Sequence, residues 1–247
     1  MNVCTDQLAM LLADEGQLLS VSSLAYDKRT SAMVDEAQGY IKNTGRAEEV
    51  FLLKPDLVIA GTYTARAAVT MLERLNIEVV TIPPAASLKE VRAGILAVGA
   101  ALGQPERAAA LAAEFDAGLA ALQPDANLRK PRAALYGANG YTVGSQTLSG
   151  EMLTAAGFIN IASELGLSHG GTLPLELLAL SAPEVVITSQ PYPGASRSEA
   201  VPRHPVVARM QAQAVSTKMN DGDWLCGTPF VLRAIKGLAQ QREALDQ

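Results

Sequence analysis

Short apolar runs recur along the chain and alternate with longer stretches in which apolar residues return every three or four positions. The short runs are rich in Val, Ile and Leu and predict buried strands at 18–23, 57–61, 78–82, 132–137 and 184–189. The periodic stretches predict helices at 6–13, 29–38, 47–53, 65–75, 87–102, 105–122, 148–156, 173–181 and 227–243. Because strands and helices take turns, we expect an α/β fold with mostly parallel sheets covered by helices.

One predicted helix, over 104–123, is longer than the others and is bounded by prolines. Pro105 suits a first helical turn, and Pro124 ends the helix. An apolar stripe follows one side of it, formed by Ala108, Leu111, Ala112, Phe115, Leu119 and Leu122. The helix could lie on the surface of one domain, but βα patterns before and after it in the sequence favour a rigid helix that connects two lobes. We therefore expect two α/β lobes, 1–103 and 124–247, joined by the single backbone helix 104–123.

An internal repeat supports two lobes. Aligning Pro55 with Pro183, an offset of 128 residues, superposes 47–61 on 175–189. In both copies a glutamate stands seven residues before the proline, Glu48 in one and Glu176 in the other. Each glutamate opens a short apolar helix that leads into a strand. A helix, a turn with proline and a strand are common in α/β proteins, so chance similarity is the alternative.

Charge and composition exclude several classes of protein. The chain has 247 residues, with 20 Lys and Arg against 25 Asp and Glu, so no basic excess favours nucleic acid. No apolar run reaches the roughly 18 residues of a membrane-spanning helix. Two cysteines and two histidines without paired spacing exclude a structural zinc finger. The amino terminus shows no secretory signal pattern, so any export signal was removed or never existed.

Catalytic motifs are absent from the sequence. The string nearest to a nucleophile elbow, 143–147, lacks both glycines in register. Neither a dinucleotide-binding GxGxxG nor a phosphate-binding GxxxxGK[ST] occurs. The tight acidic pairs, such as Asp35 with Glu36, are plausible solvated helix ends. We therefore expect a binding protein and not an enzyme; the alternative is an α/β enzyme acting on a small molecule in an interlobe cleft.

Three segments, NVCTDQLAMLLAD at 2–14, GRAEEVFLLKPDLVIAG at 45–61 and LPLELLALSAPEVVITS at 173–189, carry a family resemblance. Together with the lone long helix, they resemble the periplasmic substrate-binding proteins of iron-siderophore and cobalamin ABC importers. The resemblance implies two lobes on one backbone helix, with a ferric siderophore or related metal chelate or corrinoid held in the cleft. It also implies a periplasmic monomer that delivers its ligand to a membrane permease driven by a separate ATPase.

In one respect the chain departs from the family. The family normally has a full first strand before the position of Val3, and in this chain that strand is shortened to about three residues. A signal sequence absent from this chain can therefore lie upstream. We expect no cofactor of the protein's own, although the ligand can carry iron or cobalt. The sequence does not distinguish siderophore from cobalamin or haem.

Loops that follow parallel strands are the expected ligand-facing edge, and most tyrosines fall there. Aromatic rings give large, rigid contact area, although tyrosines also prefer half-exposed sites for other reasons. The predicted aromatic walls are Tyr63, Tyr141, Tyr192 and Trp224, with Thr5, Asp6 and Arg203 as weaker polar candidates. His169 and His204 lack companions at ligand spacing, so we predict no metal site.

Two residue pairs take roles from the resemblance. It implies that Glu48 and Glu176 each bind permease arginines, whereas the alternative is simple complementarity to the helix dipole. It also places Cys4 at a strand end and Cys226 before the last helix, both toward the cleft side. A disulfide between them and two separate buried thiols remain equal alternatives.

Overall fold

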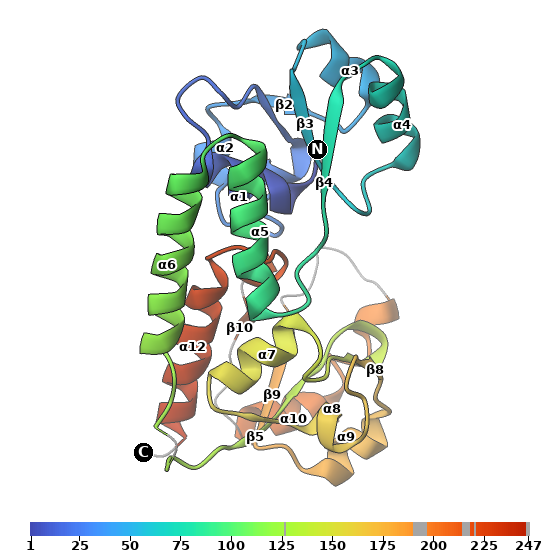
Figure 1. Ribbon diagram of the computed structural model, residues 1–247. Coiled ribbons are helices and arrows are strands. Elements are labelled where there is room, and N and C mark those ends of the chain that lie inside the picture. Colours follow the sequence, from blue (N-terminus) through green and yellow to red (C-terminus); the bar gives the residue numbers. More distant parts are fainter. Residues whose placement is uncertain (126, 190–196, 214–217, 220, 246–247) are drawn as a thin grey trace. The chain divides into compact units, whose positions relative to one another are not determined.

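The computed structural model describes residues 1–125, 127–189, 197–213, 218–219 and 221–245, which form two compact units (Figure 1). Unit 1 consists of Met1–Ala85, Lys89–Ala117 and Leu225–Phe230. Unit 2 consists of Ala86–Leu88, Gly118–Trp224 and Val231–Gln247. The division falls inside the long helix, after residue 117, and assigns residues 225–230 to unit 1. The predicted ranges 1–103, 104–123 and 124–247 instead keep the helix separate and place 225–230 in the second lobe.

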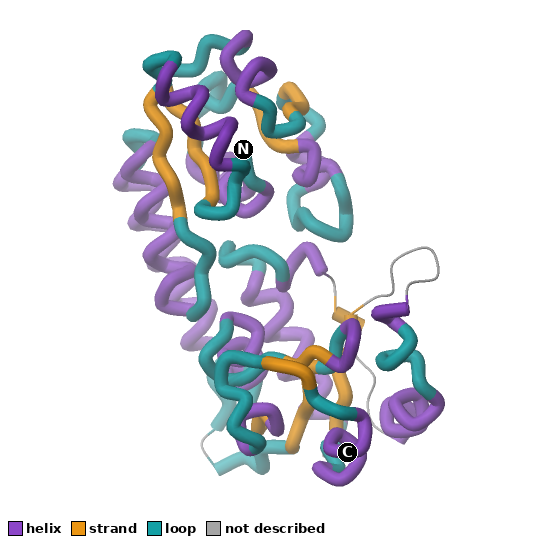
Figure 2. The backbone as a smooth tube through the Cα atoms, turned by 90° about the vertical axis from the view of Figure 1, so that its right-hand side faces the viewer, coloured by secondary structure: helices purple, strands orange, loops and turns teal. Residues whose placement is uncertain are grey.

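Unit 1 contains two parallel strand pairs flanked by helices (Figure 2). Strand β1 pairs with β2, and β3 pairs with β4 in a register that sets Leu57 opposite Glu78 and Gly61 opposite Ile82. In chain order, the elements are α1 (Val3–Leu12), β1 (Ser20–Ser22), α2 (Val34–Ala37), β2 (Ile41–Asn43), α3 (Ala47–Leu52), β3 (Leu57–Gly61), α4 (Arg66–Arg74), β4 (Glu78–Ile82) and α5 (Leu88–Ala101).

Local sequence explains where these elements begin and end. The Asn2 side chain accepts a hydrogen bond from the Cys4 amide at 2.9 Å and caps α1. Asn76 takes a positive φ of 59° just after α4, a conformation that asparagine tolerates and that turns the chain into β4. Alternating apolar positions of β3 then face inward, where Val58 joins Val50 and Leu72 in one buried cluster.

The long helix α6 (Pro105–Ala121) agrees with the predicted helix to within two residues at each end. Three members of the predicted stripe, Ala108, Ala112 and Phe115, are buried. Helix α5 approaches α6 closely, because a Cβ at Gly99 would lie 2.1 Å from the Cβ of Ala108. Only glycine permits this contact. Residues 105–117 of the helix belong to unit 1 and its last residues to unit 2.

Unit 2 is built on a parallel sheet with the strand order β10-β9-β5-β7 and a short antiparallel pair, β6 with β8. Each described sheet lies wholly within one unit. The elements are β5 (Arg132–Leu135), β6 (Tyr141–Thr142), α7 (Leu148–Ala155), β7 (Ile159–Asn160), α8 (Ile161–Glu164), β8 (Gly171–Thr172), α9 (Leu175–Ser181), β9 (Val185–Ser189), α10 (Pro205–Gln213), β10 (Lys218–Met219), α11 (Asp221–Trp224) and α12 (Val231–Ala244).

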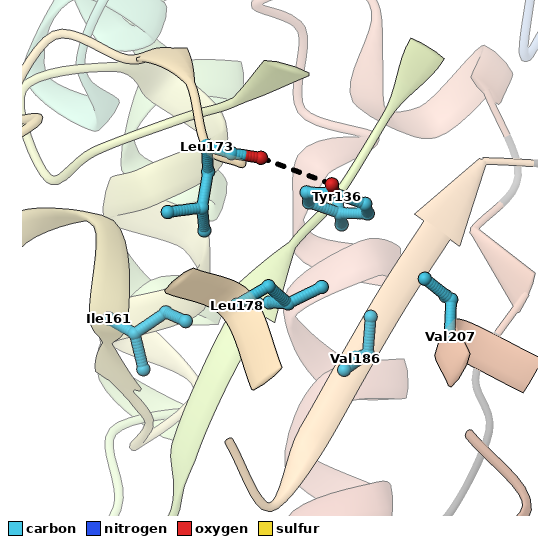
Figure 3. Packing of buried hydrophobic residues seen from close by; sticks show 7 residues of the cluster. Tyr136, Ile161, Leu173, Leu178, Val186 and Val207 are labelled. Carbon is cyan, nitrogen blue, oxygen red and sulfur yellow. Dashed lines mark hydrogen bonds between the residues drawn. The ribbon is translucent and has the colours of Figure 1, made fainter. Parts of the chain in front are cut away.

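The core of unit 2 gathers around Tyr136, which is 1% exposed (Figure 3). Its hydroxyl donates a hydrogen bond to the Leu173 carbonyl at 3.1 Å, so the buried phenol keeps a partner. The same cluster contains Ile161 of α8, Leu178 of α9 and Val186 of β9. The apolar runs of the sequence thus supply both the sheet and the helices that cover it.

The α/β class with mostly parallel sheets is confirmed, whereas several single elements were predicted wrongly. Only the last turn of the predicted helix 29–38 forms, as α2, because its first residues make turns held by Asp27 and Thr30. Helix α10 was missed, and strands such as β2 and β7 are too short to show a period. No helix among the described residues is long and apolar enough to cross a membrane.

Candidate ligand-binding site

A cavity of about 300 Å³ lies in unit 1 where β3 and β4 end. Its walls come from the first turns of α1, from the loop that begins at Gly61, from Ile82–Ala85 after β4, and from Leu225 with Gly227. Because the two strands are parallel and in register, both of their carboxyl ends reach this cavity. This edge is where ligands bind in open parallel sheets.

A disulfide between Cys4 and Cys226 holds one wall of the cavity in place, with the two Cα atoms 5.0 Å apart. The bond spans 222 residues and fixes the segment 225–227 against the start of α1. Gly227 permits a close approach to the loop after β4, since a Cβ there would lie 2.4 Å from the Cβ of Ala85. The sequence did not decide between a disulfide and two separate thiols; in the structure the two cysteines form a disulfide.

Of the predicted ligand residues, Tyr63 and Thr5 line this cavity. Tyr63 is 85% exposed, so its ring is free to contact a ligand. Thr5 is buried, and its hydroxyl already donates to the Asn2 carbonyl at 2.9 Å. Thr5 therefore offers a ligand mainly its methyl group, while Tyr63 offers the larger surface.

Asp6 lies outside this cavity and has a structural partner. Its side chain is 4% exposed, and Oδ2 accepts a hydrogen bond from the Ser22 amide at 2.8 Å. It borders a second hollow of about 350 Å³, lined in part by β1 and β3 and also by Asn43. That hollow contains none of the predicted aromatic walls. The hydrogen bond ties α1 to β1, which accounts for a buried carboxylate without a ligand.

Several residues of the cavity were not predicted. Pro83 and Pro84 follow β4, Glu90 stands in the first turn of α5, and Leu225 is 55% exposed beside the disulfide. The strand-end rule would have found the two prolines, because the predicted strand 78–82 ends directly before them. No local signal places Leu225 there, since contacts far apart in the sequence, the disulfide and the approach of Gly227 to Ala85, hold its segment in unit 1.

Tyr141 lies at the corresponding edge of the sheet in unit 2. It begins β6, is 50% exposed, and borders a hollow of about 140 Å³ with Leu135 and Ile187 of the parallel strands. The neighbouring Tyr136 is buried, and burial together with the negative charge of Glu176 raises the pKa of its phenol. Within the part of the chain that the structure describes, each unit therefore presents a well-exposed tyrosine where its parallel strands end.

The remaining predicted ligand residues have weaker structural support. Trp224 ends α11 in unit 2 and is 8% exposed, so little of its ring is open to a ligand. Arg203 is exposed in the turn before α10. Tyr192 lies outside the described residues. A ligand-binding role for these three residues stays a prediction.

The structure holds no obvious cluster of metal ligands in its described part. No group of three or more His, Cys, Asp or Glu side chains could hold an ion within those ranges. His204 accepts a hydrogen bond from the Val206 amide through Nδ1 at 3.2 Å, which satisfies that nitrogen locally. The cavity at the ends of β3 and β4 is lined by apolar residues such as Pro83 and Pro84, by the ring of Tyr63 and by polar residues such as Glu90.

Glu48 and Glu176 are both exposed in the first turns of their helices, α3 and α9. Among the residues that the structure describes, neither has a hydrogen-bond or ion-pair partner. The adjacent Glu49 differs, because the Thr44 amide and hydroxyl donate to its carboxylate and lower its pKa. Glu49 therefore stabilises the turn before α3, whereas Glu48 and Glu176 remain open to a partner.

A sequence profile of the family described as periplasmic binding proteins matches residues 2–217. The chain belongs to this family. Periplasmic binding proteins are not enzymes, which confirms the expectation of a binding protein. Membership also implies an extracytoplasmic location for this periplasmic binding protein.

Individual relatives agree with the family. Over 192 residues, the chain is 29% identical to the cobalamin-binding protein of Halobacterium salinarum, an alignment that covers 76% of this chain and 52% of the relative. The chain thus spans about half the length of the curated relatives it matches.

Solved structures show the same fold. The periplasmic heme-binding protein RhuT from Roseiflexus sp. RS-1 is 19% identical, with a TM-score of 0.75 over 98% of this chain and 97% of that one. The periplasmic vitamin B12 binding protein BtuF of Vibrio cholerae is 18% identical, with a TM-score of 0.68 over 97% and 93% of the two chains. At these identities, the likeness concerns the fold alone.

Proposed function

We propose that this chain is the solute-binding component of an ABC importer in the periplasm. It captures a ferric siderophore, haem or a corrinoid and delivers it to a membrane permease. The observation that carries the proposal is the cavity at the ends of β3 and β4, with the exposed Tyr63 at its wall, in a member of the periplasmic binding protein family.

The chemistry of the cavity suits such a ligand. A metal chelate or macrocycle presents a broad, partly apolar face, and rigid aromatic and proline surfaces bind such faces at low entropic cost. Tyr63, Pro83 and Pro84 supply those surfaces here. The relative from Halobacterium salinarum is a cobalamin-binding protein, and this supports a corrinoid among the candidates. The metal then arrives with the ligand, and the protein needs no cofactor of its own.

Delivery requires a surface that the permease can recognise. Glu48 and Glu176 support this step, because each is exposed and neither makes a hydrogen bond or an ion pair among the described residues. A carboxylate in that state binds an arginine of another protein without first breaking an internal contact. We assign the two glutamates to permease docking.

Replacing Tyr63 by alanine tests the ligand site. We expect the dissociation constant of the ligand class that binds to rise about tenfold, because a stacked ring contributes roughly 1 kcal/mol or more beyond the area it buries. The measurement is equilibrium titration with ferric enterobactin, haemin and cyanocobalamin. Met71→Ala is the control, since Met71 is 47% exposed in unit 1 and does not line the cavity.

Equal affinity of the Tyr63→Ala variant and the wild-type protein would contradict the assignment of Tyr63 as a wall. Mass spectrometry of the ligand after incubation addresses the enzyme alternative at the same time. A binding protein returns the ligand with unchanged mass, whereas a conversion that depends on the protein would favour an enzyme.

A further inference from the structure

The two helices that carry Glu48 and Glu176 bury matching sides. The offset of 128 residues that pairs the glutamates also pairs Val50 of α3 with Leu178 of α9. Val50 is 4% exposed and Leu178 0%. Each helix thus packs on its own unit through the same position of the repeat, so the opposite side of each helix faces outward in the same register.

On its outward side, each of the two helices has an exposed leucine at the same position of the repeat. Leu52 of α3 and Leu180 of α9 stand 128 residues apart and are 76% and 80% exposed. They are the two most exposed leucines of the described chain. Single exposed apolar side chains are common on protein surfaces. Two that occupy equivalent positions of an internal repeat, each next to an exposed glutamate, are harder to attribute to chance.

Helical geometry puts each leucine beside its glutamate. Glu48 and Leu52 are four residues apart within α3, and Glu176 and Leu180 are four apart within α9. Side chains at this spacing lie on one face, one turn from each other. Each unit therefore presents a carboxylate and a branched apolar side chain as neighbours.

We infer that Leu52 and Leu180 are apolar contacts for the permease, each packing into a hollow next to the basic residue that binds the adjacent glutamate. This inference rests on the proposed function. The charge of the pair indicates the occupant, because an exposed carboxylate is complementary to a cation on the partner, and an exposed leucine is complementary to an apolar surface beside that cation. The two pairs occupy equivalent positions of the repeat, so the same kind of permease surface would fit each of them.

The apolar contacts carry affinity, while the glutamates give orientation and attraction at a distance. A salt bridge at a rim contributes little by itself, whereas a leucine that becomes buried on binding contributes through removal of its surface from water. Docking should therefore depend on the leucines even at high salt, where the attraction of the glutamates is screened.

The double variant Leu52→Ala with Leu180→Ala tests this inference. The measurement is the dissociation constant between the purified chain, without added ligand, and its cognate permease–ATPase complex in lipid nanodiscs. We expect binding about 10 to 100 times weaker than wild type, at both 50 mM and 500 mM salt. Affinity for cyanocobalamin and haemin should not change. Leu24→Ala with Leu128→Ala is the matched control, since these leucines are 50% and 43% exposed and lie outside α3 and α9.

A second double variant, Glu48→Gln with Glu176→Gln, separates the two levels of the proposal. If it weakens docking while the leucine variant binds as tightly as wild type, the inference is wrong and the proposed function stands. If the wild-type chain itself does not bind the permease, the proposed function fails. If the leucine variant instead loses self-association in sedimentation and keeps permease binding, the leucines join copies of this chain, which also overturns the inference.

Discussion

Replacing Cys4 and Cys226 together by alanine is expected to lower the free energy of unfolding by about 3 to 5 kcal/mol. The disulfide spans 222 residues and ties the segment 225–230 into unit 1. Without it, the unfolded chain gains the conformational entropy that the closed loop had removed. A folded unit 2 shortens the flexible part of that loop, which sets the lower end of the range.

Urea unfolding followed by far-UV circular dichroism measures this change, and reduction of the wild-type protein is the control that should reproduce it. Hydrogen exchange adds a local test, because amides of α1 and of 225–230 should lose protection before the rest of unit 1. A loss below about 1 kcal/mol, with protection unchanged, would contradict the structural role of the bond.

Replacing Gly150 by alanine should destabilise unit 2 by about 3 kcal/mol, an effect large enough to impair folding. A Cβ at this position of α7 would lie 1.9 Å from the Gly144 carbonyl oxygen. That neighbour is backbone and cannot rotate away. The loop before α7 is also held by the Thr147 hydroxyl, which donates to the same carbonyl at 2.8 Å. The chain must therefore shift to admit even a methyl group.

Gly237→Ala is the matched control, because it introduces the same methyl group into α12, where a Cβ meets no atom within 4 Å. Alanine is the better helix former there and should stabilise by about 0.5 to 1 kcal/mol. Emission of Trp224, a residue of unit 2, follows both unfolding transitions. Similar stability of the two variants would show that α7 does not approach Gly144 as closely as described.

The fold class could be predicted from the sequence because its largest elements carry clear periods. Strand β3 occupies the predicted residues 57–61, and α6 begins and ends within two residues of the prediction. The helix predicted over 29–38 does not form over most of its length. The side chains of Asp27, just before it, and of Thr30 make hydrogen bonds with the local backbone that hold turns in place of a helix. Short strands such as β7 form because they pair with β5, which is distant in the sequence, and a local sequence pattern carries no information about that pairing.

The site was less predictable, because long-range contacts decide it. The strand-end rule placed Tyr63 and Tyr141 at the ends of parallel strands, where both are exposed, and their contact with a ligand stays a prediction. The same rule suggested Asp6, but a hydrogen bond from the Ser22 amide uses its carboxylate. Leu225 joins the cavity through contacts with residues far away in the sequence, among them the disulfide, so its place could not be derived from the residues around it.

The central claim is that this periplasmic binding protein captures a metal chelate or corrinoid at the cavity beside Tyr63. Isothermal titration of the purified, ligand-free chain with cyanocobalamin, haemin and ferric enterobactin tests it most directly. The account predicts saturable binding of one of these classes, a dissociation constant near 1 µM or tighter, and about tenfold weaker binding by the Tyr63→Ala variant. Absence of saturable binding to all three classes, or equal binding by the variant, would contradict it.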